Sequence, residues 1–200
     1  SREPSLPHPG AMLDAAERLD RLHDLGRAIR ARAGEPVPAM PESAALFVNL
    51  HTQDLLDEAL YDPEQPLARI ASRVVLEITE RASLHGVRDV QQRMARLREM
   101  GFRIAVDDLG AGYAGLNSFS QLEPEVVKLD MTLIRDVHEQ PKKLTLVRTM
   151  ITMCRDLGIQ VVAEGIEVPE ERDALVWAGC DLLQGYLFAK PAPAFPAVVW

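Results

Sequence analysis

Five short apolar runs, rich in β-branched residues, each lead into a polar side chain, and this pattern constrains the fold more than any other feature of the chain. The polar residues are Asn49, Glu77, the pair Asp107-Asp108, Lys128 and Glu164. Continuous apolar runs are typical of strands buried on both faces of a parallel sheet. When such strands deliver acids, an amide and a lysine to one end, the layout is that of a metal-dependent active site on a βα barrel.

Helical periodicity alternates with these runs. Apolar residues recur at three- and four-residue intervals, which predicts helices over residues 12–33, 86–100, 141–157 and 169–178. Gly34, Gly101, Gly158 and Gly179 follow these segments, and glycine commonly ends a helix. Strands are predicted over about 45–50, 73–79, 103–107, 125–129, 159–163 and 181–187, and loops over 35–44 and 61–66.

Alternating strands and helices predict an α/β fold with a parallel sheet, either open or closed into a barrel. In an open sheet the functional residues would gather at one switch point in the strand order. Here polar residues follow nearly every strand, which favours the barrel. We therefore expect a single domain over residues 1–200 with a TIM-like βα barrel, of which about six βα units are visible.

Composition excludes several function classes. The formal net charge of -8 argues against a DNA or RNA polymer as partner, although bound cations can still attract a small phosphorylated ligand. No run of 18 apolar residues is present, and the first ten residues show no signal-peptide pattern, so we expect a cytoplasmic protein without membrane contact from this segment. The five histidines lack zinc-site spacing, and the oxygen-bearing side chains at the strand ends favour Mg²⁺ or Mn²⁺.

The motifs at these strand ends resemble, in order and spacing, those of the EAL domain family, which comprises bacterial phosphodiesterases that hydrolyse cyclic di-GMP to linear pGpG on a modified (β/α)8 barrel. The resemblance runs from about Leu13 to Pro193. The matching segments are 76–80 (LEITE), 106–113 (VDDLGAGY), 127–130 (VKLD), 163–167 (AEGIE) and 184–188 (QGYLF).

The resemblance implies roles for individual residues. Metal ligands would be Asn49, Glu77, Asp107, Asp108 and Glu164, with Asp107 bridging two cations. Two metals would be Mg²⁺ or Mn²⁺, and Ca²⁺ would bind but inhibit turnover. Lys128 would help to activate the attacking water. Glu80 would anchor the glycine loop that contains Gly110 and Gly112. Glu167 and Gln184 would support the site without contacting the metals.

The chain departs from the family pattern in its signature. The Glu-Ala-Leu tripeptide at residues 58–60 follows Asn49, which is the wrong place, so we interpret that match as accidental. In the family, two strands precede the helix that is predicted here over 12–33, and the second ends in the signature Glu. The resemblance therefore predicts that these two strands and one metal ligand belong to a longer polypeptide. In the loop after Asp108, three hydroxyl side chains of the family are replaced.

Simpler interpretations remain for single residues. Asn49 alone could be a turn former, Glu77 an edge charge, and Lys128 with Asp130 a structural ion pair. Together they favour a metal site, because burying several carboxylates without cations is costly. The alternatives are a catalytically inactive EAL-like module that acts as a cyclic di-GMP receptor or a protein-interaction domain, and another divalent-metal barrel enzyme such as a proton-abstracting lyase. The resemblance also predicts a homodimer and an upstream sensory or receiver domain.

Overall fold

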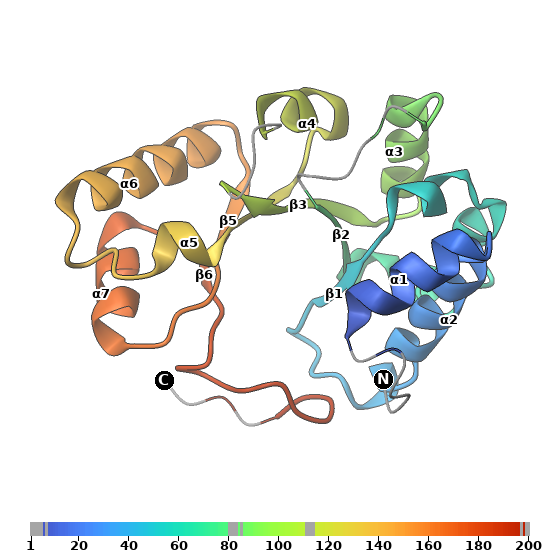
Figure 1. Ribbon diagram of the computed structural model, residues 1–200, viewed down its shortest axis with the longest axis horizontal. Helices are drawn as coiled ribbons and strands as arrows, with labels where there is room; N and C mark the ends of the chain where they lie inside the picture. The colour runs from blue at the N-terminus through green and yellow to red at the C-terminus, as the bar shows by residue number, and fades with distance from the viewer. Residues whose placement is uncertain are drawn as a thin grey trace. The chain divides into compact units, whose positions relative to one another are not determined.

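Strands β2 to β6 of the computed structural model form a parallel sheet in which each strand pairs with the next along the chain (Figure 1). The structure describes residues 6, 8–79, 84, 86–110, 115–196 and 198, and only the backbone of 115–118. These residues group into two compact units, Ser1–Val74 with Ser83–Phe102 and Val75–Ala82 with Arg103–Trp200, and each unit is described separately.

Six strands are present among the described residues, close to where the sequence predicts them. They are β1 (Leu46–Asn49), β2 (Val74–Thr79), β3 (Arg103–Leu109), β4 (Val126–Leu129), β5 (Gln160–Ala163) and β6 (Leu182–Leu183). The prediction of a strand over 181–187 is too long. The chain turns after Gln184, where the backbone N–H of Phe188 donates to the carbonyl of Gly185 at 3.1 Å.

Helices of the second unit are α4 (Gly115–Leu122), α5 (Met131–Ile134), α6 (Pro141–Asp156) and α7 (Pro169–Ala178), and α3 (Val90–Glu99) belongs to the first. In the second unit, α6 packs against both β5 and α7 (Figure 1). Gly101, Gly158 and Gly179 have φ angles of 101°, 73° and 83° just after α3, α6 and α7, which confirms the predicted glycine ends. The helices α4 and α5 are short and were not predicted.

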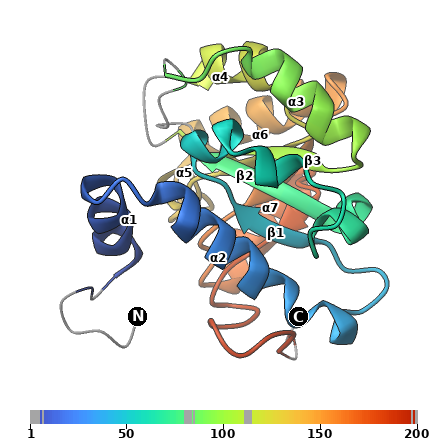
Figure 2. The ribbon, with the colours of Figure 1, turned by 90° about the vertical axis from the view of Figure 1, so that its right-hand side faces the viewer.

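The predicted helix over 12–33 is wrong, because two helices occupy this segment: α1 (Pro9–Arg18) and α2 (Leu22–Gly34) (Figure 2). Asp20 between them has a left-handed φ of 53°. The N–H of Asp20 donates to Glu17 O at 3.0 Å and that of Arg21 to Ala16 O at 2.7 Å, the two bonds of a Schellman helix end. Asp occupies the position where glycine is usual, so the break escapes a search for glycine.

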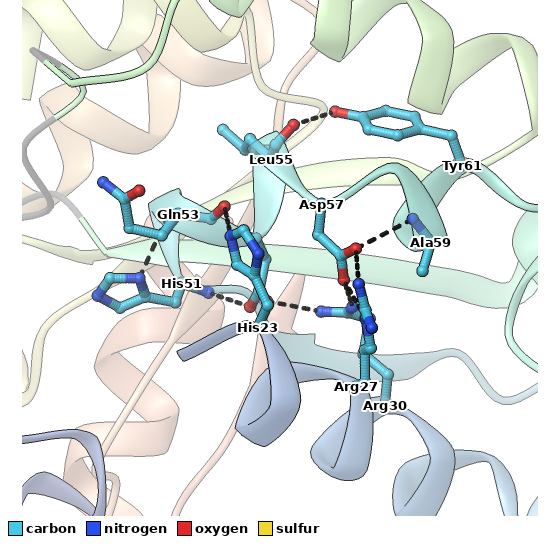
Figure 3. Close-up of polar contacts among 10 residues, drawn as sticks. His23, Arg27, Arg30, His51, Gln53, Leu55, Asp57, Ala59 and Tyr61 are labelled. Carbon is cyan, nitrogen blue, oxygen red and sulfur yellow. Dashed lines mark hydrogen bonds and ion pairs between the residues drawn. The ribbon is translucent and has the colours of Figure 1, made fainter. Parts of the chain in front are cut away.

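In the first unit, ion pairs connect α2 to the turns that follow β1. These turns are short 3-10 helices, η2 (Thr52–Leu56) and η3 (Glu58–Tyr61), and two others are η1 (Val37–Ala39) and η4 (Ala68–Arg73). Asp57 is almost fully buried, and its carboxylate forms ion pairs with Arg27 at 2.7 Å and Arg30 at 3.0 Å, both from α2 (Figure 3). The carboxyl of Asp54 pairs with Arg30 at 3.0 Å, and a Cβ on Gly26 would overlap it. Glycine is therefore needed for this close approach.

Local contacts also explain two sequence features of the first unit. Glu58 of the misplaced tripeptide has a mostly exposed side chain, which pairs with Arg96 at 3.0 Å and Arg93 at 3.7 Å. The Nδ1 of His51 accepts the backbone N–H of Gln53 at 3.2 Å, and His23 contacts the carbonyl of Gln53 at 3.0 Å (Figure 3). The histidines thus serve local structure.

The core of the second unit is the sheet itself. The side chains of Ile104, Ala105 and Val106 on β3 and of Val126 and Val127 on β4 are fully buried, as in a sheet covered on both faces. Among the described residues, no helix is long and apolar enough to span a bilayer.

Candidate active site

A bulge at the end of β3 brings two consecutive carboxylates to one place. Val106 pairs with Val127 and Leu109 with Leu129, so Asp107 and Asp108 together face the single residue Lys128. Asp108 has a left-handed φ of 59°, and its backbone N–H donates to Oδ1 of Asp107 at 3.0 Å. Successive side chains of a regular strand point to opposite faces, whereas a bulge changes the direction of one of them. Both acids can therefore act at one site.

Lys128 joins three carboxylates from three different strand ends. Its Nζ lies 2.6 Å from Oε1 of Glu77 on β2, 3.0 Å from Oδ1 of Asp107 on β3 and 2.7 Å from Oε1 of Glu164 just after β5. All four side chains are largely buried. The convergence at one end of a parallel sheet, which the sequence predicted for these residues of the second unit, is therefore present.

Burial and charge shift the protonation of this cluster in a consistent way. Burial raises the pKa of Glu77 and of Glu164, and the ammonium of Lys128 offsets part of this rise. For Lys128 burial favours the neutral amine, but the ion pairs with Glu77 and Glu164 outweigh it and raise the pKa. These ion pairs therefore favour the protonated ammonium of Lys128, which donates hydrogen bonds to the carboxylates.

The donor set fits divalent cations that prefer oxygen ligands. Asp107, Asp108 and Glu164 each offer a carboxylate oxygen, and these oxygens lie within 4.8 Å of one another. Glu77, Asp107 and Glu164 pair with the ammonium of Lys128, and Asp108 lies beside two of them, which leaves an excess of negative charge among these five described side chains in a largely buried place. Such an excess is costly unless cations balance it. The residues that could hold the metals are thus Glu77, Asp107, Asp108 and Glu164.

The other predicted site residues have different outcomes. Asn49 ends β1 in the first unit with an exposed side chain, and its role as a metal ligand stays a prediction. Glu80 and Gly112 lie outside the described residues. Gly110 has a φ of 105°, and a Cβ there would overlap the side chain of Leu133, so glycine is needed for chain geometry.

The segment that carries Glu164 is held by contacts on both sides. The N–H of Ile166 donates to Gln184 O at 3.1 Å, and the N–H of Leu187 donates to Ile166 O at 3.0 Å. Glu167 forms an ion pair with Arg135 at 2.6 Å. Glu167 and Gln184, predicted as supporting residues, therefore both lie next to the segment of Glu164.

Two acids, Asp130 and Glu171, hold backbone near the site in ways that the sequence analysis did not predict. Asp130 directly follows β4 and caps α5, accepting the N–H of Thr132 at 2.9 Å, so it is not the structural partner of Lys128 that was considered. Glu171 is fully buried and accepts the N–H groups of Asp136 and Glu167, each at 2.9 Å. Burial alone would raise the pKa of Glu171, but these backbone hydrogen bonds outweigh burial and lower it. The position of Asp130 at the end of a predicted strand could have identified it from the sequence. Glu171 lies within a helix, where no sequence pattern distinguishes it.

A cavity of about 610 Å³ in the second unit adjoins these carboxylates. Acids from the strand ends contribute to its wall, and so does the chain after β6 from Gln184 to Pro196. The volume is within the range of small-molecule sites, about 300–1,000 Å³. The lining residues are Asp108, Asp130, Met131, Glu164, Gly165, Glu167, Gln184, Gly185, Tyr186, Ala189, Lys190, Pro191, Ala192, Ala194, Phe195 and Pro196.

Most of the chain is similar in sequence to known proteins. Cyclic di-GMP phosphodiesterase RocR of Pseudomonas aeruginosa is 33% identical over 82% of this chain and 41% of its own length. Cyclic di-GMP phosphodiesterase PdeR of Escherichia coli is 30% identical over 76% of this chain and 24% of its own length. The chain thus spans less than half the length of these relatives.

Solved structures agree with the fold described above. BlrP1 of Klebsiella pneumoniae, in a complex with calcium and cyclic di-GMP, is 32% identical over 96% of this chain and 50% of its own, with a TM-score of 0.81. A standalone EAL protein of Vibrio cholerae in its cyclic di-GMP-bound form is 27% identical over 94% of this chain and 82% of its own, with a TM-score of 0.76. These similarities confirm the predicted α/β class of the TIM-barrel type. The family described as the EAL domain matches residues 1–191, and the chain belongs to it.

Proposed function

We propose that this chain hydrolyses cyclic di-GMP to linear pGpG with two divalent cations. The observation that carries the proposal is the convergence of Glu77, Asp107, Asp108 and Glu164 on Lys128 at one end of the sheet. Relatives that are named cyclic di-GMP phosphodiesterases, and similar structures with manganese or calcium and cyclic di-GMP, support the same activity.

Glu77, Asp107, Asp108 and Glu164 would hold Mg²⁺ or Mn²⁺, and the family resemblance assigns Asn49 as a further ligand. Such a pair of cations neutralises the phosphate oxygens and lowers the pKa of the attacking water. Asp108 and Glu164 lie close enough to Asp107 to share in the same site. Ca²⁺, with its longer and less regular coordination, would support substrate binding but little turnover.

Lys128 would orient the attacking water by donating a hydrogen bond. Its ion pairs favour the protonated form, so in this proposal it would act as a positive hydrogen-bond donor. Hydrolysis breaks one bond between phosphorus and a ribose 3′ oxygen, and water supplies the hydroxyl to phosphorus and a proton to the leaving oxygen. Glu164, which lies 2.7 Å from Lys128, can accept a hydrogen bond from the same water.

The test is turnover of cyclic di-GMP by the purified protein with Mg²⁺, Mn²⁺, Ca²⁺ or EDTA, followed by chromatography of the nucleotides. We expect pGpG with Mg²⁺ or Mn²⁺, binding without significant turnover in Ca²⁺, and neither product nor tight binding in EDTA. Robust hydrolysis in EDTA would contradict the mechanism. Binding without turnover in every metal would instead identify an inactive cyclic di-GMP receptor.

The proposal also covers the oligomeric state, the domain organisation and the location of the protein. A homodimer, an upstream sensory or receiver domain and a cytoplasmic location are expected from the family resemblance, as is a single EAL-type domain over residues 1–200. Sedimentation of the purified protein with and without cyclic di-GMP would test the dimer.

A further inference from the structure

The cavity beside the carboxylates has a strongly uneven charge. Its lining includes four acids, which are Asp108, Asp130, Glu164 and Glu167. Lys190 is the only cationic side chain among its described lining residues. Divalent cations at the metal ligands would attract one phosphate group, whereas a second phosphate on the same ligand would depend on another source of positive charge.

Lys190 is a cation without an acidic partner in the described part of the chain. Its Nζ lies 5.8 Å from the centre of the Tyr186 ring, and no carboxylate is within ion-pair distance among the described residues. By contrast, Lys128 pairs with three carboxylates, and Lys143 donates to the carbonyl of Arg135 at 2.5 Å. Lys190 is exposed and lines the cavity, so its ammonium is available to an anionic ligand that enters there.

The backbone around Lys190 restricts where its side chain can reach. Phe188 is buried, and the N–H of Ala189 donates to Gly185 O at 3.3 Å. Pro191 follows directly, and its ring limits the conformations of the residue before it. The ring of Tyr186 adds a cation–π contact, which orients the ammonium without neutralising it. Lys190 lines the cavity, and no described carboxylate neutralises its charge.

We propose that Lys190 binds the second, non-reacting phosphate of a cyclic dinucleotide and so determines specificity for a ligand with two phosphates. This inference rests on the proposed function. In the proposed complex the reacting phosphate would lie at the metal cluster, and the other phosphate would face Asp130 and Glu167, the lining acids that are not proposed metal ligands, of which Glu167 is paired with Arg135. Lys190 supplies the one side-chain cation among the described lining residues that can offset this repulsion. Tyr186 is a positioning residue in this arrangement.

The experiment compares Lys190→Gln, Lys190→Arg and the wild type, with Lys142→Gln as the matched control. Lys142 is exposed on α6, does not line the cavity, and loses the same charge when changed. With Mn²⁺, Lys190→Gln should raise KM for cyclic di-GMP about ten-fold and leave kcat unchanged, because it removes a charge-assisted contact that is present before and during the reaction. Lys190→Arg should retain a KM near that of the wild type, and Lys142→Gln should not change it.

Four further measurements separate ligand binding from a structural role. The affinity for Mn²⁺ alone, measured by calorimetry, and the thermal midpoint should be the same in Lys190→Gln and the wild type. The competitor GpG has a single phosphodiester, so its inhibition constant should also be unchanged by Lys190→Gln. The KM of the wild type should rise more steeply with salt than that of the variant.

The outcomes distinguish this inference from the proposed function. An unchanged KM for cyclic di-GMP in Lys190→Gln would overturn the inference, as would an equal loss of affinity for GpG or a loss of Mn²⁺ affinity. If the wild type binds Mn²⁺ but neither binds nor cleaves cyclic di-GMP, the proposed function itself fails. If the wild type cleaves cyclic di-GMP and Lys190→Gln is indistinguishable from it, only the assignment of Lys190 fails.

Discussion

The carboxylate of Asp107 accepts a hydrogen bond from the backbone N–H of Asp108 at 3.0 Å, and the same Oδ1 lies 3.0 Å from Nζ of Lys128. The left-handed backbone of Asp108, with a φ of 59°, makes this bond part of the bulge. Asp tolerates such a φ better than most residues with a Cβ. The pair therefore couples backbone conformation to the geometry of the proposed metal site.

Asp108→Asn should separate the charge of this residue from its conformation. Asn tolerates a left-handed φ and has nearly the same shape, so the free energy of unfolding should change by less than about 1 kcal/mol. The loss of one anionic ligand should weaken Mn²⁺ binding about ten-fold or more, as measured by calorimetry. Asp108→Ala should lower both metal affinity and stability, because Ala adopts this φ less readily. Equal metal affinity in Asp108→Asn and the wild type would exclude Asp108 as a ligand.

Lys128→Met should make stability depend on divalent cations. The variant leaves Glu77, Asp107 and Glu164 buried without their shared ammonium, which should cost on the order of 3 kcal/mol in EDTA. Saturating Mn²⁺ should recover much of this loss, since it binds only the folded state. Turnover should fall about 100-fold or more with Mn²⁺ affinity retained.

Chemical denaturation with and without Mn²⁺ tests this expectation, and Lys142→Met on the exposed surface of α6 is the control. A loss of stability in Lys128→Met that Mn²⁺ does not reduce would show that Lys128 supports the fold independently of the metal ligands. A loss of Mn²⁺ affinity as large as in Asp107→Ala would contradict its assigned role as a donor to water.

The sequence was sufficient to predict the strand ends and the cluster of the second unit. Glu77, Asp107 and Glu164 each end a buried apolar run, and parallel strands must bring such ends together. The bulge was not predictable, because it depends on how β3 pairs with β4, and that pairing places two residues against Lys128. Local pattern sets the strands, whereas register between strands decides where the side chains point.

The remaining differences between the predicted and the observed structure arise at residues that the usual sequence patterns do not single out. Asp20 occupies a left-handed helix end where glycine was expected, so one predicted helix is two. Glu171 stabilises the segment of Glu167 through backbone N–H groups, which a pattern of side chains does not show. Lys190 lines the cavity because the chain turns after β6, at a position where the sequence predicted a continuing strand.

The Asp57 carboxylate in the first unit should make stability depend on acid pH. The hydrogen bond from Arg27 is the largest cause that lowers its pKa from 3.8 to about 2, although burial opposes this shift. A carboxylate with a lowered folded-state pKa stabilises the fold above its unfolded pKa, and this stabilisation is lost as pH falls from about 4 to about 2. Arg27→Met should therefore destabilise the protein at pH 7, and the difference from wild type should shrink across that acid range.

Denaturation midpoints between pH 2 and pH 7 would measure this difference, and Arg21→Met provides the control because its pair with Asp24 is exposed on both sides. We expect little change for Arg21→Met at any pH. A deficit in Arg27→Met that stays constant down to about pH 2 would mean that packing, and not the charge of Asp57, explains the loss.

Gly185→Ala should disrupt the support of the segment that carries Glu164. A Cβ at this position would overlap the backbone N and O of Ile166, both of which form hydrogen bonds to the chain around Gly185. Backbone cannot move aside as a side chain can, so we expect a loss of about 3 kcal/mol or more in the free energy of unfolding. Since Glu164 lies two residues before Ile166, Mn²⁺ affinity should fall as well.

Gly158→Ala is the matched comparison for that variant. Gly158 has a left-handed φ of 73°, but nothing lies within 4 Å of the added Cβ. Only backbone strain opposes the change, so we expect a cost of about 1 kcal/mol and an unchanged affinity for Mn²⁺. Urea denaturation and calorimetry of both variants test the distinction between strain and close approach. Equal losses of stability in the two variants, or full Mn²⁺ affinity in Gly185→Ala, would show that the contact with Ile166 does not hold Glu164 in place.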